Sequence, residues 1–444
     1  MDSLIRFDGC RTYGGYQMFE KLIPAILAAT MLLMNIPVFA APVPNEASSD
    51  TKTQAAKQKE KGFYSVTAYG GAKGDGKTDD TVSFQKALNA AARDDGGIVF
   101  VPTGSYMIKG HLVIPANVTL EGVSRAPTRG AYSGSTLLAV EGKGDPDGEP
   151  FIQVRTNSTL KGMAVVYPDQ DSDKPVPYPW CVRGRGDNCS IIDVFLLNPW
   201  QAVDFSTGRH YIRGLYGQPL HTGIFVDGCL DVGRIKDVHF WPFWSVGLKD
   251  FTSQQATAFI FGRTDWEFVD SCFCIFYKVG FHFVANERGP GNVVITNSGS
   301  DVGPTAVLVE NCQGHAGIAW TNCQFMSSIE IKETNTGPVK FANCGFWGIE
   351  TTTSHANIKG SGHVTFNECH FNGWDRKNEG QPAIYADGNG LTIAACDFMD
   401  ADHKQVVLGE NAKATIIMGN RLRGGAKIEN RSKGKVEMGL NVDE

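Results

Sequence analysis

The chain contains 444 residues, more than the roughly 100–200 of a typical domain, although β-solenoids and barrels reach this length as one unit. Its 51 glycines predict many turns between short strands. The formal net charge of −6 excludes a general basic field for nucleic acid, so an acidic substrate would need a local basic patch.

The N-terminal region predicts export. Residues 18–41 carry one lysine and a long apolar run that ends in small residues, which predicts a signal peptide over 1–41, with Met18 as an alternative start. An uncleaved membrane anchor is the alternative, because the run is almost long enough to span a bilayer. With cleavage, we expect a secreted or periplasmic protein without a stable membrane span. Residues 42–61 are polar and predict a disordered linker, and 62–444 are assigned to one β-helix domain.

A helical pattern over 81–93 lies between two glycine-rich turns. Asp79 and Asp80 are expected to supply its N-cap and first-turn acid, and the glycines at 96–97 end it. The strand 98–102 then begins the first turn of the domain. Because an open solenoid exposes an apolar core at its first rung, we expect this helix to cap it.

Repeated phrases indicate a solenoid. Three segments each place a proline after a short apolar run, at Pro199, Pro219 and Pro242, with spacings of 20 and 23 residues. A proline cannot donate to a strand ladder, so each is expected to end a strand. Spacings this short leave no room for a crossover helix. Short strand–turn–strand repeats of this kind are typical of a parallel β-helix.

A cysteine phrase repeats in the same way. A polar residue, a cysteine and a nearby aromatic residue recur in 270–273, 322–325, 343–346, 368–371 and 395–398. Strand alternation would place the thiol and the ring two residues later on one face, so we expect ladders of both inside the coil. A metal site would require closely spaced pairs of cysteines such as C-x2-C, which this phrase lacks. We therefore predict stacked buried thiols and no metal ligands.

The run 69–122, from "YGGAKGDGKTDDTVSFQKALNAA" to "GGIVFVPTGSYMIKGHLVIPANVTLEG", resembles the N-terminal signature of the pectate lyase superfamily. This group includes rhamnogalacturonase-like and epimerase-like proteins. The resemblance implies an all-β fold, a single-stranded right-handed parallel β-helix (pectin lyase-like) with an N-terminal capping α-helix. It leaves the chemistry open, since the group includes hydrolases, lyases, epimerases and phage tailspikes, and fold alone does not give function.

Known catalytic motifs of such proteins do not match. Polygalacturonase-type enzymes carry Asn-x-Asp, Asp-Asp, Gly-His-Gly and Arg-x-Lys on successive coils. This chain has Arg234-Ile235-Lys236, but its Asp-Asp pairs at 79–80 and 94–95 lie at the predicted capping helix and the other preceding elements are missing. The Asp-Pro-His-Glu motif of alginate epimerases is absent as well. The resemblance therefore does not assign a reaction.

The window 178–250 combines acids, histidines, arginines and tryptophans more densely than any other. Since equivalent positions of successive turns stack about 4.8 Å apart, we expect these side chains to share one cleft. The predicted catalytic residues are Asp204, Asp227, Asp231, His221 and His239. The predicted substrate-binding residues are Arg183, Arg185, Trp200, Arg209, His210, Arg234, Trp241 and Trp244.

Two carboxylates on neighbouring rungs suit glycoside hydrolysis. Alignment on the prolines places Asp227 and Asp250 at equivalent positions, and Asp204 and Asp231 offer wider pairs. Repulsion between two neighbouring carboxylates raises the pKa of one of them, so that a protonated acid lies beside an ionised base. A separation of about 5 Å suits a retaining enzyme and about 6.5–9.5 Å an inverting one. Each aspartate alone is more often a turn cap.

Three functions follow from these residues. We favour an exported glycoside hydrolase that acts on a pectin-like or other uronate-containing glycan. A lyase is the first alternative, with Ca²⁺ or arginine neutralising the uronate and a histidine as base. A non-catalytic glycan-binding or tailspike-like β-helix is the second. Nucleic acid is not an expected partner, and a homotrimer is left open.

Overall fold

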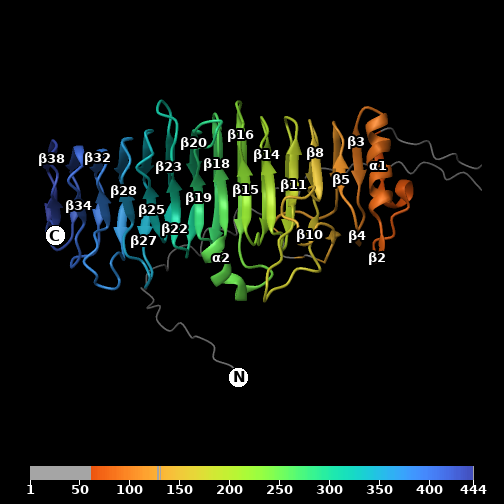
Figure 1. Ribbon diagram of the computed structural model, residues 1–444, viewed down its shortest axis with the longest axis horizontal. Helices are drawn as coiled ribbons and strands as arrows, with labels where there is room; N and C mark the ends of the chain where they lie inside the picture. Colours follow the sequence, from red (N-terminus) through yellow and green to blue (C-terminus); the bar gives the residue numbers. More distant parts are fainter. Residues whose placement is uncertain (1–61, 128–129, 131, 444) are drawn as a thin grey trace, which may run out of the picture. The chain divides into compact units, whose positions relative to one another are not determined.

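The computed structural model describes residues 62–127, 130 and 132–443. Their strands pair in parallel and stack side by side along one axis (Figure 1). This arrangement is an all-β parallel β-solenoid, which confirms the predicted fold class. The predicted signal peptide and linker fall in 1–61 and lie outside the described residues, as does the alternative start at Met18.

The strands form two long sheets. Sheet B contains β5 (Leu112–Ile114), β8 (Ile152–Arg155), β11 (Trp180–Arg185), β13 (Gln201–Phe205), β15 (Thr222–Val226), β17 (Thr257–Phe261), β19 (Val279–Phe283), β22 (Thr305–Val309), β25 (Ser328–Ile331), β28 (Ala356–Ile358), β31 (Ile384–Ala386), β34 (Val406–Leu408) and β37 (Ile428–Asn430). Sheet A contains β1 (Phe63–Ser65), β2 (Asp75–Asp79), β3 (Gly97–Phe100), β4 (Gly104–Ile108), β6 (Val118–Glu121), β7 (Ser135–Ala139), β9 (Thr159–Lys161), β10 (Ala164–Val166), β12 (Ser190–Leu196), β14 (Tyr211–Gly217), β16 (Gly233–Phe240), β18 (Glu267–Ile275), β20 (Val293–Thr296), β21 (Gly299–Asp301), β23 (Ile318–Thr321), β24 (Gln324–Phe325), β26 (Val339–Ala342), β27 (Gly345–Trp347), β29 (Val364–Asn367), β30 (His370–Asn372), β32 (Asn389–Ala394), β33 (Asp397–Phe398), β35 (Lys413–Met418), β36 (Arg421–Leu422), β38 (Val436–Gly439) and β39 (Val442–Asp443).

Each turn of the chain visits sheet B, then sheet A, and returns to sheet B one rung further along. In sheet B, Val203 of β13 pairs with Ile224 of β15. In sheet A, Ile212 of β14 pairs with Ile235 of β16. Residues about twenty positions apart in the sequence are therefore direct neighbours in space.

Sheet A bends once in every turn at a residue with positive φ, here called the corner residue. Left-handed backbone at one position redirects the strand, and Asn, Asp and Gly tolerate it best. The corner residues along the solenoid include Gly162, Asp193, Gly214, Asp237, Ser271, Asn297, Asn322, Asn343, Glu368, Ala395, Gly419 and Leu440. We call the part of sheet A before the corner its first half and the part after it its second half.

The predicted ladders of thiols and rings are present in the core. Cys323, Cys344, Cys369 and Cys396 are all buried and free, as are the other cysteines of the described residues. In each of the five phrases the thiol donates to the carbonyl two residues earlier, at 3.3–3.4 Å. The rings that follow stack with centroid distances of 5.3, 4.7 and 4.7 Å from Phe325 through Phe346 and Phe371 to Phe398.

The first copy of the phrase departs from the others. Position 274, two residues after Cys272, is a second buried cysteine, and the aromatic Phe273 directly follows Cys272 and faces outward. Burial raises the pKa of the Cys272 thiol, so this group stays neutral. The ring ladder therefore begins only at Phe325.

The helix α1 (Thr81–Arg93) lies beside the first strands and buries Phe84 and Leu88 (Figure 1). Asp80 occupies the N-cap position but makes no capping hydrogen bond with its side chain, which corrects that expectation. Its buried carboxylate instead accepts from the backbone N–H groups of Lys73, at 2.7 Å, and Gly74, at 3.1 Å. Asp80 therefore fastens the glycine-rich loop to the start of the helix. The role of α1 as a cap stays a prediction.

The register of sheet B corrects one predicted equivalence. Thr222 of β15 pairs with Thr257 of β17, and the chain between β16 and β17 forms an excursion that contains a 3-10 turn (Val246–Leu248) and α2 (Lys249–Gln255). Asp250 lies on α2 and is not on the rung next to Asp227. Counting from the prolines missed this because it did not allow for an inserted helix.

No helix in the described ranges combines the length and the apolar character needed to cross a bilayer.

The stacked rings generate a first prediction. Phe371→Ala removes a fully buried ring that stacks on both Phe346 and Phe398, so we expect the free energy of unfolding to fall by about 3–5 kcal/mol. Phe268→Ala is the matched control, because Phe268 is 38% exposed, and it should cost about 1 kcal/mol or less. Chemical denaturation measures both. Equal losses would contradict the core ladder.

Candidate functional site

Asp204 and Arg183 form a pair on the outer face of sheet B. They are register partners on β13 and β11, and Arg183 Nε donates to the Asp204 carboxylate at 2.6 Å. Asp204 also accepts from the backbone N–H and hydroxyl of Ser206, at 3.1 and 2.6 Å. The carboxylate is buried, and its oxygens hold a turn together with an arginine. Arg185, at the exposed end of β11, pairs in register with Arg155.

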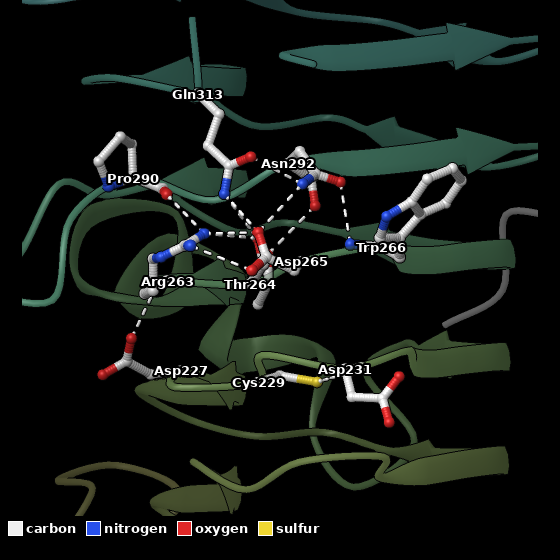
Figure 2. A network of polar contacts seen from close by, with 10 residues as sticks. All are labelled: Asp227, Cys229, Asp231, Arg263, Thr264, Asp265, Trp266, Pro290, Asn292 and Gln313. Carbon is white, nitrogen blue, oxygen red and sulfur yellow. Dashed lines mark hydrogen bonds and ion pairs between the residues drawn. The ribbon is translucent and has the colours of Figure 1, made fainter. Parts of the chain in front are cut away.

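Asp227 and Asp231 lie on one turn but point to opposite sides of it (Figure 2). Asp227 is buried, accepts from the backbone N–H of Arg263 at 2.7 Å and lies 3.5 Å from Arg288. Asp231 is exposed and binds Arg209 at 3.1 Å. The two carboxylates therefore do not face one another as an acid and a base would.

The turns around these aspartates form a polar network at the edge of the sheets (Figure 2). Asp265 lies at its centre and accepts from Arg263 at 2.6 Å and from Gln313 at 2.6 Å. Asn292 donates to Gln313 at 2.8 Å and accepts from the Trp266 backbone at 2.9 Å. Side chains from three successive turns thus bind one another, which indicates a structural role for this network.

Histidine and tryptophan side chains pair at the entrance to sheet B. The His221 ring stacks on Trp200 with centroids 4.9 Å apart and an interplanar angle of 17°. Phe251 of α2 packs against the same indole at 6.0 Å. Burial lowers the pKa of His221, so its ring is neutral near pH 7. The α2 excursion therefore covers this pair.

His239 and Trp241 lie on the outer face of the second half of sheet A. His239 pairs in register with Tyr216 on one side and Phe273 on the other. Its ring lies 6.0 Å from that of Trp241. Trp244, three residues after Trp241, packs against an apolar cluster that contains Phe195.

The remaining predicted binding residues occupy other surroundings. His210 is completely buried and contacts Glu267, so it cannot touch a polymer in this conformation. Arg209 is exposed and binds Asp187 at 2.8 Å as well as Asp231. Arg234 is exposed on the first half of sheet A, between the register partners Tyr211 and Phe268.

The predicted residues therefore form small groups on separate surfaces. Four groups are real contacts: Arg183 with Asp204, His221 with Trp200, Arg209 with Asp231, and His239 with Trp241. They come from the outer face of sheet B, the entrance to sheet B, the turns after it and the second half of sheet A respectively. No single cleft within the described part of the chain unites the predicted acids.

Two adjoining pockets lie along the corner of sheet A, one on the side of its second half and the other on the side of its first half. One has a volume of about 360 Å³ and is lined by Ser271, Cys272, Phe273, Asn297, Ser298, Gly299, Ser300, Asp301, Asn322, Gln324, Met326 and Trp347. The other has a volume of about 470 Å³ and is lined by Ala126, Asp193, Arg213, Lys236, Asp237 and Ser271. Because Ser271 lines both, the two pockets adjoin, and we call them together the corner groove.

The corner groove contains its own titratable groups. Burial raises the pKa of Asp301 above its ordinary value, which favours a protonated acid. Burial also acts to raise the pKa of Asp270, next to Ser271, but hydrogen bonds from Asn297 and Lys236 outweigh it and lower that pKa. Trp347 Nε1 donates to Gln324 at 3.1 Å, which holds the indole beside the pocket.

The smaller pocket combines ring faces, amides and one protonatable acid, and the larger adds two cations. Arg213 lies 3.9 Å from Asp193, and Lys236 lies 3.1 Å from Asp270, so both cations already have carboxylate neighbours. Tyr216 donates to Asp237 at 3.3 Å. Burial is the main cause that raises the pKa of Tyr216, and the Asp237 carboxylate adds to this effect. A tyrosine with a raised pKa is a poor base near pH 7.

Sequence reasoning missed most of this groove. Asp301, Gln324 and Trp347 lie outside the window 178–250, and only the corner positions and the strand register bring them together. The repeat of Asn before the core cysteines was the available signal. Those asparagines occupy the corner, and the side chains beside the corner line the groove.

Comparisons with known proteins agree with this fold. Residues 63–148 match the model of the family described as "Rhamnogalacturonase A/epimerase, pectate lyase-like", which confirms the predicted resemblance. Alginate lyase 7 of Azotobacter vinelandii is 42% identical over 72 residues, which are 15% of this chain and 8% of that protein. The matched segment thus spans a small part of that relative.

Two solved structures match this chain over most of its length. The N-terminal fragment of gene product 12 of bacteriophage phi29 has a TM-score of 0.61 at 13% identity, over 86% of this chain and 70% of that chain. The A-module of the Azotobacter vinelandii mannuronan C-5 epimerase AlgE6 has a TM-score of 0.44 at 16% identity, over 86% of this chain and 99% of that chain. At these identities the likeness to the phi29 fragment shows the fold alone.

The different surroundings of the predicted acids generate a second prediction. Asp204→Ala leaves the Arg183 guanidinium and the Ser206 donors without their partner, so we expect a loss of about 1–3 kcal/mol in the free energy of unfolding. Asp231→Ala, at an exposed ion pair, should change it by about 0.5 kcal/mol or less. Urea denaturation of the two variants compares them. A larger loss for Asp231→Ala would refute the structural role of Asp204.

Proposed function

We propose that this protein acts on a polysaccharide, which it binds in the corner groove of sheet A. The observation that carries the proposal is the adjacency of two pockets, of about 360 and 470 Å³, which share Ser271 and are lined by residues from several turns of the solenoid. A long open groove suits a polymer, whereas a small metabolite would be held in a closed cavity.

The lining of the groove supports a sugar ligand. The exposed face of Trp347 and the outward ring of Phe273 offer apolar surfaces to the C–H faces of sugar rings. Asn297, Asn322 and Gln324 add amide donors and acceptors that suit sugar hydroxyl groups. The family description and the name of the alginate lyase relative support the same ligand class.

The cations at one end of the groove suit an acidic sugar. The side chains of Arg213 and Lys236 are about half exposed, so a ligand carboxylate would be able to compete for them with Asp193 and Asp270. We therefore propose a uronate-containing polymer, with the acidic sugar near Arg213 and the stacked sugar near Trp347. A neutral glycan would not use the two cations.

Cleavage by hydrolysis is the finer proposal, with Asp301 as the general acid. Its raised pKa supports proton donation to a leaving oxygen, because general acid catalysis requires the protonated form. Among the described residues that line the smaller pocket, Asp301 is the one acidic residue, so the paired carboxylates of a glycosidase are not both found there. This observation favours binding without cleavage as the second candidate function.

The third prediction concerns binding. Trp347→Ala removes the exposed ring of the smaller pocket, so affinity for the polysaccharide should fall about tenfold, or about 1.4 kcal/mol. Trp266→Ala is the matched control, because Trp266 is 64% exposed and lines neither pocket, and it should bind as the wild type does. Affinity electrophoresis in pectin, rhamnogalacturonan, alginate and xylan gels measures both.

Each outcome of that experiment is informative. Retardation in uronate gels that Arg213→Ala weakens, and that xylan does not produce, supports an acidic ligand. Retardation that depends on Trp266 and not on Trp347 would move the site away from the corner groove. Free migration of the wild type in all four gels would overturn the proposal of a glycan ligand of these classes.

The fourth prediction separates hydrolysis from elimination and from binding alone. Asp301→Asn should abolish new reducing ends while leaving affinity for the gel matrix unchanged. Because burial raises the pKa of Asp301, hydrolysis by the wild type should persist to higher pH than an ordinary carboxyl allows, and should decline as the pH rises through this pKa. Ultraviolet absorbance of unsaturated products would instead establish a lyase. Binding without either product would establish the second candidate function.

A further inference from the structure

Three side chains of different chemistry meet in the interior at one edge of the sheets. His210 precedes β14, Cys229 lies in the turn after β15 and Glu267 begins β18. Their ligand atoms all lie within 4.8 Å of one another, and all three residues are fully buried. Nothing in the proposed glycan site uses them.

Strand register explains how His210 and Glu267 meet. Gly233 pairs with Glu267 in sheet A, and the Arg234 N–H donates to the His210 carbonyl at 3.0 Å, so His210, Gly233 and Glu267 occupy equivalent positions on three successive rungs. A Cβ at Gly233 would clash with Glu267 Oε2 and would lie 2.7 Å from His210 Cε1. The glycine on the middle rung thus provides the space in which the two side chains reach one another.

The contacts of the cluster resemble those of metal ligands. His210 Nδ1 lies 3.1 Å from the Thr207 carbonyl, an interaction that places the proton on Nδ1 and directs Nε2 inward. Nε2 lies 2.9 Å from Glu267 Oε1. The second carboxylate oxygen, Oε2, is buried and has no hydrogen-bond partner within the described structure. A buried carboxylate oxygen without a partner is costly, so an additional ligand at this point would stabilise it.

We propose that His210, Cys229 and Glu267 bind one divalent transition-metal ion of the Zn²⁺ type at a structural site. An imidazole nitrogen, a thiolate and a carboxylate oxygen are the donors that Zn²⁺ takes. Small shifts of the three side chains would bring each donor atom to the bond length of about 2.0–2.3 Å from one ion. The Asp231 carbonyl, which accepts from the Cys229 thiol, is the donor available for the fourth position.

Charge and proton balance are consistent with this site. Binding removes the Cys229 thiol proton and any proton shared by His210 and Glu267, and releases them to solvent. A thiolate and a carboxylate then offset the two charges of the ion, and the imidazole stays neutral. The buried cluster would carry no net charge, which suits an interior without water.

Without a metal, the same residues would form a buried ion pair. Burial disfavours a charged imidazole, but the nearby Glu267 carboxylate outweighs it and raises the pKa of His210 to about 10. This alternative explains the contact between His210 and Glu267. It leaves Glu267 Oε2 unpaired, and this observation favours the metal, which would also use the nearby Cys229 thiol.

Cobalt loading of the full-length protein tests the site. The chain is purified without chelators, its zinc content is measured by mass spectrometry, and Co²⁺ is then exchanged in. We expect about one metal per chain and a near-ultraviolet thiolate-to-cobalt charge-transfer band. Cys229→Ser should remove the band, whereas Cys274→Ser, at a buried thiol that contacts Ser300, should retain it.

A conservative variant distinguishes loss of a metal ligand from loss of folding. Glu267→Gln keeps the shape of the side chain and removes its charge, and it should lower the bound metal at least tenfold while the circular dichroism spectrum stays that of a β-solenoid. Wild-type protein that binds no Co²⁺ with a thiolate band would overturn the proposal and leave the buried ion pair. Retention of the band by Cys229→Ser would overturn it as well. Glycan affinity is measured separately, so this result does not depend on the proposed function.

Discussion

Every structural feature of this protein depends on parallel strands lying in register, turn upon turn. The hydrogen-bond ladder fixes each residue opposite one equivalent residue of the next turn, at a spacing of about 4.8 Å. The ladder of phenylalanines, the row of corner residues and the meeting of His210 with Glu267 across Gly233 are consequences of this one constraint. The side chain at a given position therefore limits which side chains fit at the equivalent position of the next turn.

The sequence was sufficient to predict the solenoid because its repeats are local and periodic. Cys323, Cys344, Cys369 and Cys396 recur at nearly the length of one turn, and their burial in the core follows from the same spacing. Excursions between strands were not predictable in this way. The α2 insertion carries Asp250 away from the rung beside Asp227, and no periodic signal marks where such an insertion begins or ends.

The candidate site was only partly predictable, because composition identifies residue types but not the direction in which they point. His239 and Trp241 do lie on an outer face, whereas Asp204 and Asp227 hold turns through backbone hydrogen bonds. The groove residues Asp301, Gln324 and Trp347 are dispersed in the sequence and are gathered only by the corner geometry. The buried cluster of His210, Cys229 and Glu267 could not be predicted from closely spaced cysteines, because its ligands come from separate turns.

The corner groove is central to the proposed function, as the surface that would hold a polysaccharide. A crystal structure of the protein with a uronate oligosaccharide tests this assignment most directly. We predict sugar rings along the corner groove, with one ring on Trp347 in the second half of sheet A and a carboxylate near Arg213 or Lys236 in its first half. Sugar bound on the outer face of sheet B, or a groove that stays free of sugar at saturating ligand, would contradict it.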